Sequence, residues 1–437
     1  MRTLIVNAVV IDGTGAEARP DSTVVIQDHI IEEVVPRPAV YYDRADILID
    51  AQGGFVIPGL INHHAHGLTR GPFLILGEPP LSDARVQTNL DRFLGQGVTT
   101  ALNVDGFPTT EDGIASSRFH PVSVKVSTLH TPTHLAWATE GPFCFDGVRD
   151  QHRWTVEKML ARGALAIGEA GPGLDSHWTD YTLIPRIVSE LGGNPSPKHS
   201  AALRAAAESG ERNVLLRLLH EVGVQPHHSA RFEELFAAIH DWTALARRSL
   251  EEAIQAAHSH GVPLIFHHSA ATHDLQLEAA ELLGERMIAA HSNFQCSDPD
   301  EAKRRAREVK QRRGLVDIAS GDAFGAREFH GSPSVTFALL AAGLVDLIST
   351  DYTGGFWDSM LLVIDQAYRN GVISLEQGVR LVTSAPADAI PGLAPDRGVV
   401  ATGRVADLVL TFPNELAKVK DVLVSGRSVT AYRRERT

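Results

Sequence analysis

The sequence predicts an α/β protein: a (β/α)8 TIM barrel with a small composite β-sandwich domain built from both termini. Both ends of the chain are rich in short β-branched runs that Gly, Pro and Asp separate. The long middle alternates apolar strands with helical segments, which is the pattern of a buried parallel sheet. Eight such units in one run fit a barrel. A doubly wound open sheet is the alternative, and no G-x-G-x-x-G turn supports it.

Length and composition limit the class of protein. The 437 residues include 53 Asp and Glu against 40 Lys and Arg, a formal net charge of −13. This length can bury a substantial core, and 43% hydrophobic residues exclude wholesale disorder. The acidic balance argues against nucleic acid or an anionic membrane as the main partner. With two cysteines, no targeting signal and no membrane-length apolar run, we expect a cytoplasmic protein.

The composite β domain is expected from residues 1–57 and 397–437, because the two ends share the same strand-rich style. Its strands are predicted at 4–11, 23–27, 30–35, 47–49, 405–411 and 422–424.

The barrel is expected over residues 58–396, with its first strand starting just before that boundary. The predicted strands are 55–61, 98–103, 122–130, 164–169, 262–267, 287–291, 315–320 and 345–350. The clearest helix is 231–260, where charged residues are interspersed among Leu and Ala.

A long insertion interrupts the barrel after its fourth strand. About ninety residues, 170–261, lie where a βα unit needs far fewer. We place the insertion at about 174–230, over the barrel mouth, because it follows the C-terminal end of a strand. It is interpreted as a lid, with an oligomer contact as the alternative.

Polar side chains gather where the predicted barrel strands end. Residues two apart share one face of a strand, so His64 and His66 can bind one metal ion. Acidic or imidazole groups also end the fourth, fifth, sixth and eighth strands, where a barrel places its active site. These groups are Glu169, the pair His267 and His268, His291 and Asp351. With one of His267 and His268 counted, six such groups on five strands indicate a metal site.

The motifs resemble those of the metal-dependent amidohydrolase superfamily. The order Pro-Gly-Leu-Ile-Asn-x-His-x-His over 58–66, followed by Glu, His, His and Asp at strand ends, is similar to the family pattern. The segments 398–409 and 424–427 resemble the family's return to its small β domain, so the resemblance covers essentially the whole chain. Asn62 departs from the pattern, since the family usually has Asp there. That position supports the ligands and does not bind metal.

The resemblance implies a role for each candidate ligand. His64 and His66 would hold one metal ion with Asp351, and His267 and His291 would hold a second. Glu169 takes the place of the bridging group, which is a carboxylated lysine in many members. This arrangement is similar to the binuclear branch that includes enamidase, which segments 167–173 and 257–261 also resemble. His267 is preferred to His268 because 261–267 matches the family's fifth strand.

The implied activity is hydrolysis of a carbon–nitrogen bond, in an amide or cyclic amide and not in a peptide. Two divalent ions are expected, Zn²⁺ first, with Mn²⁺ or Fe²⁺ as alternatives. A metal-bridged hydroxide would attack the carbonyl carbon, and Asp351 would be the catalytic proton shuttle. Candidate substrate-binding residues are His130, Asn293 and Tyr352. The expected partners are a small-molecule substrate and further copies of the chain in a homo-oligomer, with neither nucleic acid nor membrane.

Two alternative functions stay open. A mononuclear deaminase of a heterocycle would carry H-x-x-E at the fifth strand, but neither His267 nor His268 has a glutamate three residues later. A catalytically inactive barrel scaffold should have lost ligands, whereas this chain keeps all six.

Overall fold

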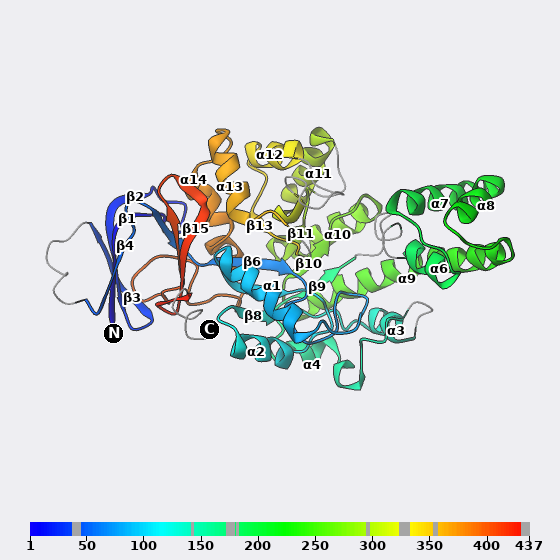
Figure 1. Cartoon of the computed structure of the whole chain (residues 1–437), viewed down its shortest axis with the longest axis horizontal. Helices are drawn as coiled ribbons and strands as arrows, with labels where there is room; N and C mark the ends of the chain where they lie inside the picture. Colours follow the sequence, from blue (N-terminus) through cyan, green and yellow to red (C-terminus); the bar gives the residue numbers. More distant parts are fainter. Residues whose placement is uncertain are drawn as a thin grey trace.

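The computed structural model describes residues 1–36, 45–140, 144–171, 180, 183–293, 298–322, 333–352 and 357–429. Figure 1 shows an elongated molecule with a β-sheet at one end, an α/β body in the middle and a helical lobe at the other end. Among the described helices, none combines the length and the apolar character needed to cross a membrane.

Strands from both ends of the chain form one eight-stranded sheet, in the order β16-β15-β14-β5-β1-β2-β3, with β4 also paired to β1. The N-terminal strands are β1 (Arg2–Val10), β2 (Arg19–Gln27), β3 (Ile30–Pro36), β4 (Ile47–Asp50) and β5 (Phe55–Pro58). The C-terminal strands are β14 (Leu408–Phe412), β15 (Glu415–Val424) and β16 (Arg427–Ser428). Strands from the two termini are neighbours in this sheet, since β5 lies between β1 and β14.

The middle of the chain forms two parallel sheets. The three-stranded sheet contains β6 (Leu60–Ala65), β7 (Val98–Asn103) and β8 (Ser123–Val126). The five-stranded sheet contains β9 (Ile167–Ala170), β10 (Leu264–His267), β11 (Met287–Ala290), β12 (Leu315–Ala319) and β13 (Leu347–Ser349). Isolated parallel bridges join the two sheets, from Thr128 to Ile167 and from Ala65 to Tyr352. Apolar side chains from these strands, such as Ile61, Ile265 and Ile288, form a buried cluster.

The expected strand over 55–61 is in fact two strands. β5 pairs with β14 in the terminal sheet, whereas β6 pairs with β7. The chain changes sheet at Gly59, where a Cβ atom would collide with Thr99. A side chain is therefore excluded at the one residue that separates the two sheets.

Helices follow most of the parallel strands, as a βα repeat requires. They are α1 (Asp83–Gly95), α2 (Thr110–Phe119), α3 (Pro132–Glu140), α4 (Val156–Ala161), α10 (His273–Leu283), α11 (Pro299–Gln311), α12 (Pro333–Ala341), α13 (Met360–Arg369), α14 (Leu375–Leu381) and α15 (Ser384–Ala389). Polar side chains cap the N-termini of some of these helices. Ser82 caps α1, and Thr109 forms a capping box with Asp112 in α2.

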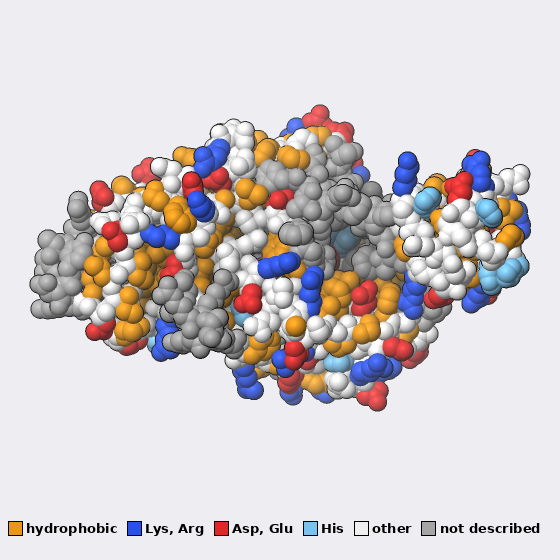
Figure 2. Space-filling model, viewed as in Figure 1, with side chains coloured by type: hydrophobic (Ala, Val, Ile, Leu, Met, Phe, Trp, Pro, Cys, Tyr) orange, Lys and Arg blue, Asp and Glu red, His pale blue; other side chains and the backbone are white. Residues whose placement is uncertain are grey.

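The insertion contains α6 (Ile184–Glu190), α7 (Pro197–Ser209) and α8 (Arg212–Glu221), and the long α9 (Ser229–His260) follows it. In Figure 1, α6, α7 and α8 form a lobe beyond the strands, and α9 connects the lobe to the body. The lobe buries apolar side chains of its own, including Leu203, Leu215 and Leu219. Figure 2 shows charged and histidine side chains distributed over its visible face. A lid function for this lobe stays a prediction.

Candidate metal centre

A bulge in β6 shapes the candidate site. Asn62 pairs with Ala101 and Ala65 with Asn103, so β6 advances three residues where β7 advances two. An extra residue of this kind re-aims the side chains around it. The consecutive residues His63 and His64 accordingly approach groups on two other strands, Asp317 of β12 and Glu169 of β9.

Asn62 ties the bulged strand to the end of β13. Its Nδ2 donates to Thr350 Oγ1 at 2.7 Å, and its Oδ1 accepts from the Thr350 amide at 3.2 Å. The same Oδ1 accepts from the His64 amide at 3.3 Å. Asn62 therefore supports the chain on both sides of the candidate site.

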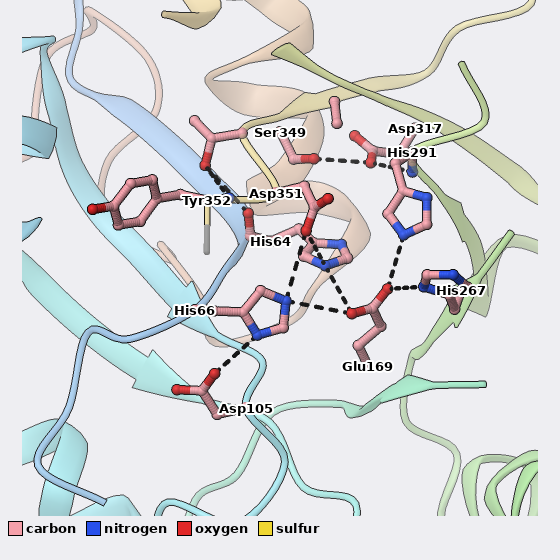
Figure 3. Close-up of polar contacts among 12 residues, drawn as sticks. His64, His66, Asp105, Glu169, His267, His291, Asp317, Ser349, Asp351 and Tyr352 are labelled. Carbon is pink, nitrogen blue, oxygen red and sulfur yellow. Dashed lines mark hydrogen bonds and ion pairs between the residues drawn. The ribbon is translucent and has the colours of Figure 1, made fainter. Parts of the chain in front are cut away.

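Four of the predicted ligands converge on one point (Figure 3). Glu169 Oε2 lies 3.4 Å from His64 Nε2 and 3.3 Å from His66 Nε2. Asp351 Oδ1 lies 3.5 Å from His64 Nε2 and 3.6 Å from His66 Nε2. Ligand atoms roughly 2.0–2.2 Å from a tetrahedral ion lie about 3.3–3.6 Å from one another. These four groups therefore have the mutual spacing of ligands around a single cation.

The remaining two predicted ligands approach the other oxygen of Glu169. His267 Nδ1 lies 2.7 Å from Glu169 Oε1, and His291 Nε2 lies 2.8 Å from the same atom. These are hydrogen-bond lengths and are shorter than the ligand spacing of the first group. Glu169 thus lies between two pairs of imidazoles, one on each carboxylate oxygen.

The electrostatics of the cluster favour positive charge. Burial opposes ionisation of Glu169, but the imidazoles of His64, His267 and His291 outweigh it and hold the carboxyl pKa well below its usual range. Burial also opposes protonation of His66, yet the carboxylates of Asp105 and Glu169 raise its pKa to about 10. The field at His66 therefore attracts a cation, which suits nitrogen and oxygen ligands of a divalent metal.

Two of the predicted ligands have left-handed backbone conformations. The φ angles are 38° at His291 and 47° at Asp351, which L-residues rarely adopt. The Asp351 amide donates to the His64 carbonyl at 3.1 Å, and the His291 amide donates to Asp317 Oδ2 at 2.9 Å. Such conformations concentrate at functional sites, where surrounding contacts maintain them.

Sequence reasoning missed Asp105, which contacts His66 directly. Its Oδ1 lies 2.9 Å from His66 Nδ1 and accepts from the Leu74 amide, while its Oδ2 accepts from the Gly67 amide. A carboxylate in this position fixes the orientation of an imidazole whose other nitrogen faces a metal. The available signal was its place, two residues beyond the second predicted strand.

The structure separates the adjacent histidines of the fifth strand. His268 Nδ1 lies 2.9 Å from Gln276 Oε1, and burial lowers the pKa of His268 to about 3. His267 alone of the two is grouped with Glu169 and His291.

The three residues predicted to bind substrate are buried, and their polar atoms have partners. His130 lies 2.9 Å from Thr128 Oγ1 through Nδ1 and 2.7 Å from the His152 carbonyl through Nε2. Burial lowers the pKa of His130 to about 4. A substrate contact through His130 would have to replace one of these two bonds.

The polar side-chain atoms of Asn293 and Tyr352 also have hydrogen-bond partners. The Asn293 amide exchanges hydrogen bonds with the backbone of Ala319 at 2.9 and 3.0 Å. The Tyr352 hydroxyl donates to Asn89 Oδ1 at 2.7 Å, and Figure 3 shows its ring directed away from Glu169. Substrate binding by either residue stays a prediction.

Comparison with known proteins gives the class of fold. No protein-family model matches the chain, and no curated protein does. Among solved structures, the beta-aspartyl dipeptidase of Fervidobacterium islandicum AW-1 is 16% identical with a TM-score of 0.58, covering 98% of this chain and 96% of that one. A D-aminoacylase described among the amidohydrolases is 16% identical with a TM-score of 0.55, covering 98% and 96%. The dihydropyrimidinase of Brevibacillus agri NCHU1002 is 15% identical with a TM-score of 0.52, covering 98% and 95%. The chain therefore shares the fold of these three solved structures over almost its whole length.

Proposed function

We propose that this protein is a metal-dependent hydrolase of a carbon–nitrogen bond in a small amide or cyclic amide. The observation that carries the proposal is the 3.3–3.6 Å spacing of nitrogen and oxygen atoms from His64, His66, Glu169 and Asp351. All four residues are buried. The His64 nitrogens also lack a hydrogen-bond partner among the described residues. Burying such polar groups is costly unless something binds them, and a cation at this point would do so.

The donor set is compatible with two divalent ions. His64, His66 and Asp351 would hold one ion, His267 and His291 the other, and Glu169 would be a ligand shared by both. Imidazole and carboxylate without thiolate suit Zn²⁺, Mn²⁺ or Fe²⁺. Bound ions of this kind polarise a substrate carbonyl and lower the pKa of a water molecule toward about 7.

Within this proposal, Asp351 moves the proton. Its carboxylate lies 3.5 Å from His64 Nε2 and 3.6 Å from His66 Nε2, and the residue is only 6% exposed. A carboxylate there can accept a proton from the attacking water and return it to the leaving nitrogen. Asp105 keeps His66 oriented during this exchange, because it binds the ring nitrogen on the far side from Glu169.

The proposal includes a closed barrel with a composite terminal domain. The two bridges that join the parallel sheets, at Thr128 and at Ala65, support closure. The strand order in the terminal sheet supports a domain made of residues 1–57 and 397–437.

A hydrolase with one metal ion is the second candidate. The observation that favours it is the contrast between the two halves of the site. His267 and His291 lie at hydrogen-bond distance from Glu169 Oε1. His66 Nε2, in contrast, lies 3.3 Å from Glu169 Oε2, which is the separation of two ligands around one ion. In that case His267 and His291 would bind substrate or hold Glu169.

The test is a hydrolysis screen on metal-loaded protein. The compounds are lactams, N-acyl amino acids, hydantoin-like rings and beta-aspartyl dipeptides, with aminated heterocycles included to detect ammonia release by a deaminase. Asp351→Asn is the matched negative control for each compound. Amide cleavage by the wild type that the control lacks supports the proposal. Ammonia release from heterocycles without amide cleavage would contradict it.

A further inference from the structure

We propose that Asp317 is a positioning residue that holds His291 in the conformation the second half of the metal centre requires. The inference rests on the proposed function, in which His291 is a metal ligand. Asp317 itself lies on β12, the one strand of the five-stranded sheet for which the sequence predicted no site residue.

Asp317 binds two successive amides of the chain that follows β11. Its side-chain Oδ2 accepts from the His291 amide at 2.9 Å, and its backbone carbonyl accepts from the Ser292 amide at 2.7 Å. Oδ2 also accepts from Ser349 Oγ of β13 at 2.9 Å (Figure 3). Asp317 of β12 thus connects the residues that follow β11 with Ser349 of β13.

The bonded amide belongs to a residue with an unfavourable backbone. His291 has a φ of 38°, whereas the preceding strand is extended. This change of direction accompanies the approach of His291 Nε2 to Glu169 Oε1, at 2.8 Å. Left-handed conformations of L-residues persist where the surroundings over-determine them, and an amide bonded to a carboxylate is one such restraint.

The carboxylate of Asp317 lies in apolar surroundings. Asp317 is fully buried within the apolar run of β12, between Val316 and Ile318. Its Oδ1 forms no hydrogen bond among the described residues and lies 3.2 Å from His63 Nε2, which is also fully buried. An apolar residue would avoid this desolvation cost but could accept a hydrogen bond from neither the His291 amide nor the Ser349 hydroxyl.

The experiment compares metal binding by four full-length proteins: wild type, Asp317→Leu, Asp317→Asn and the control Asp407→Asn. Leu has a similar shape but no acceptor, whereas the Asn oxygen can accept both bonds that Oδ2 accepts. Asp407 is a buried carboxylate that binds the Ser425 amide and Arg397 in the terminal region. Each metal-free protein is titrated with Co²⁺ alone against a chromophoric chelator, and the visible spectrum of bound Co²⁺ is recorded.

We expect two binding steps in the wild type. Asp317→Leu should weaken one step by about 10- to 100-fold, the usual effect of removing a partner of a metal ligand, and leave the spectrum of the other ion unchanged. Asp317→Asn should restore binding to within a few-fold, and Asp407→Asn should bind like the wild type. If Asp317→Leu does not fold, Asp317→Ser replaces it, because its shorter side chain keeps the pocket polar but cannot reach the His291 amide.

Two results separate this inference from the proposed function. Unchanged binding by the Leu or Ser variant, or an equal loss in Asp407→Asn, overturns the positioning role and leaves the proposed function intact. A wild type that takes up no Co²⁺ overturns both. A single binding step in the wild type overturns the positioning role together with the two-ion version of the function.

Discussion

Glu169 Oε2 lies 3.3 Å from His66 Nε2, which is the separation of two ligands that share a tetrahedral cation. The other oxygen of the same carboxylate lies 2.7 Å from His267 Nδ1, at hydrogen-bond length. One buried side chain therefore connects both halves of the candidate metal centre. The Glu169 and Asp351 variants test this arrangement.

Replacing Glu169 with Gln should lower the metal content of the purified protein. The amide is neutral and has one oxygen in place of two, so one half of the site would lose its Glu169 ligand and the other would have a weaker one. We expect a loss of at least one ion per chain by elemental analysis. Glu308→Gln is the matched control, since Glu308 pairs with His273 and Arg304 away from the site. Full metal content in Glu169→Gln would argue against a bridging role.

Asp351→Asn should remove turnover and leave metal bound. The variant keeps an oxygen near His64 and His66 but cannot accept a proton. Losing general acid–base catalysis lowers kcat by roughly 10²- to 10⁴-fold. The measurement is kcat on a compound that the screen identifies, together with metal content. A fully active variant would refute the proton-shuttle role.

Tyr352→Phe should lower stability with little effect on KM. The change leaves Asn89 Oδ1 without its donor in the core, where Asn89 is 1% exposed. Leaving a buried acceptor unsatisfied costs about 1–3 kcal/mol, which urea denaturation can measure. Tyr368→Phe is the control, because Tyr368 is 48% exposed. A severalfold higher KM at unchanged stability would instead support the substrate contact that the sequence predicted for Tyr352.

Stability should fall as the pH falls from about 6.5 toward 4. Burial lowers the pKa of His134 to about 4, against about 6.5 for an exposed histidine. Between these two pH values the unfolded state binds more protons than the folded state. The free energy of unfolding is therefore highest above about pH 6.5 and decreases as the pH falls toward 4. His134→Gln keeps a donor for the Ile75 carbonyl but does not titrate, and its Tm should decrease less between pH 7 and pH 4.5. His227→Gln, at an exposed position, should retain the wild-type pH dependence. An identical decrease in all three proteins would contradict the prediction.

Much of the candidate site could be predicted because its ligands follow apolar runs. Strand ends are local features, and parallel strands place their C-terminal ends together. This reasoning brought Glu169, His291 and Asp351 to one site from three separate strands. It did not reach Asp105 and Asp317, which contact His66 and His291. Asp105 comes two residues after a predicted strand and was overlooked, whereas Asp317 lies inside a strand and not at its end.

The fold was predicted less well where the register is irregular. Strict alternation would send His63 and His64 to opposite faces, but the bulge in β6 brings both near acidic groups. The expected strand over 55–61 divides at Gly59, because its first half pairs with β14 from the far end of the chain. Neither feature has a local sequence signal, since each depends on a neighbouring strand.

The most direct test of the central claim is the metal content per chain, measured by elemental analysis of protein purified without added metal or chelator. We predict about two equivalents of a divalent transition metal, shared by the two halves of the site through Glu169. One equivalent would favour the one-metal hydrolase. No metal, with no uptake when Zn²⁺, Mn²⁺ or Fe²⁺ is added, would contradict the proposed function. That result would support the alternative of a catalytically inactive scaffold.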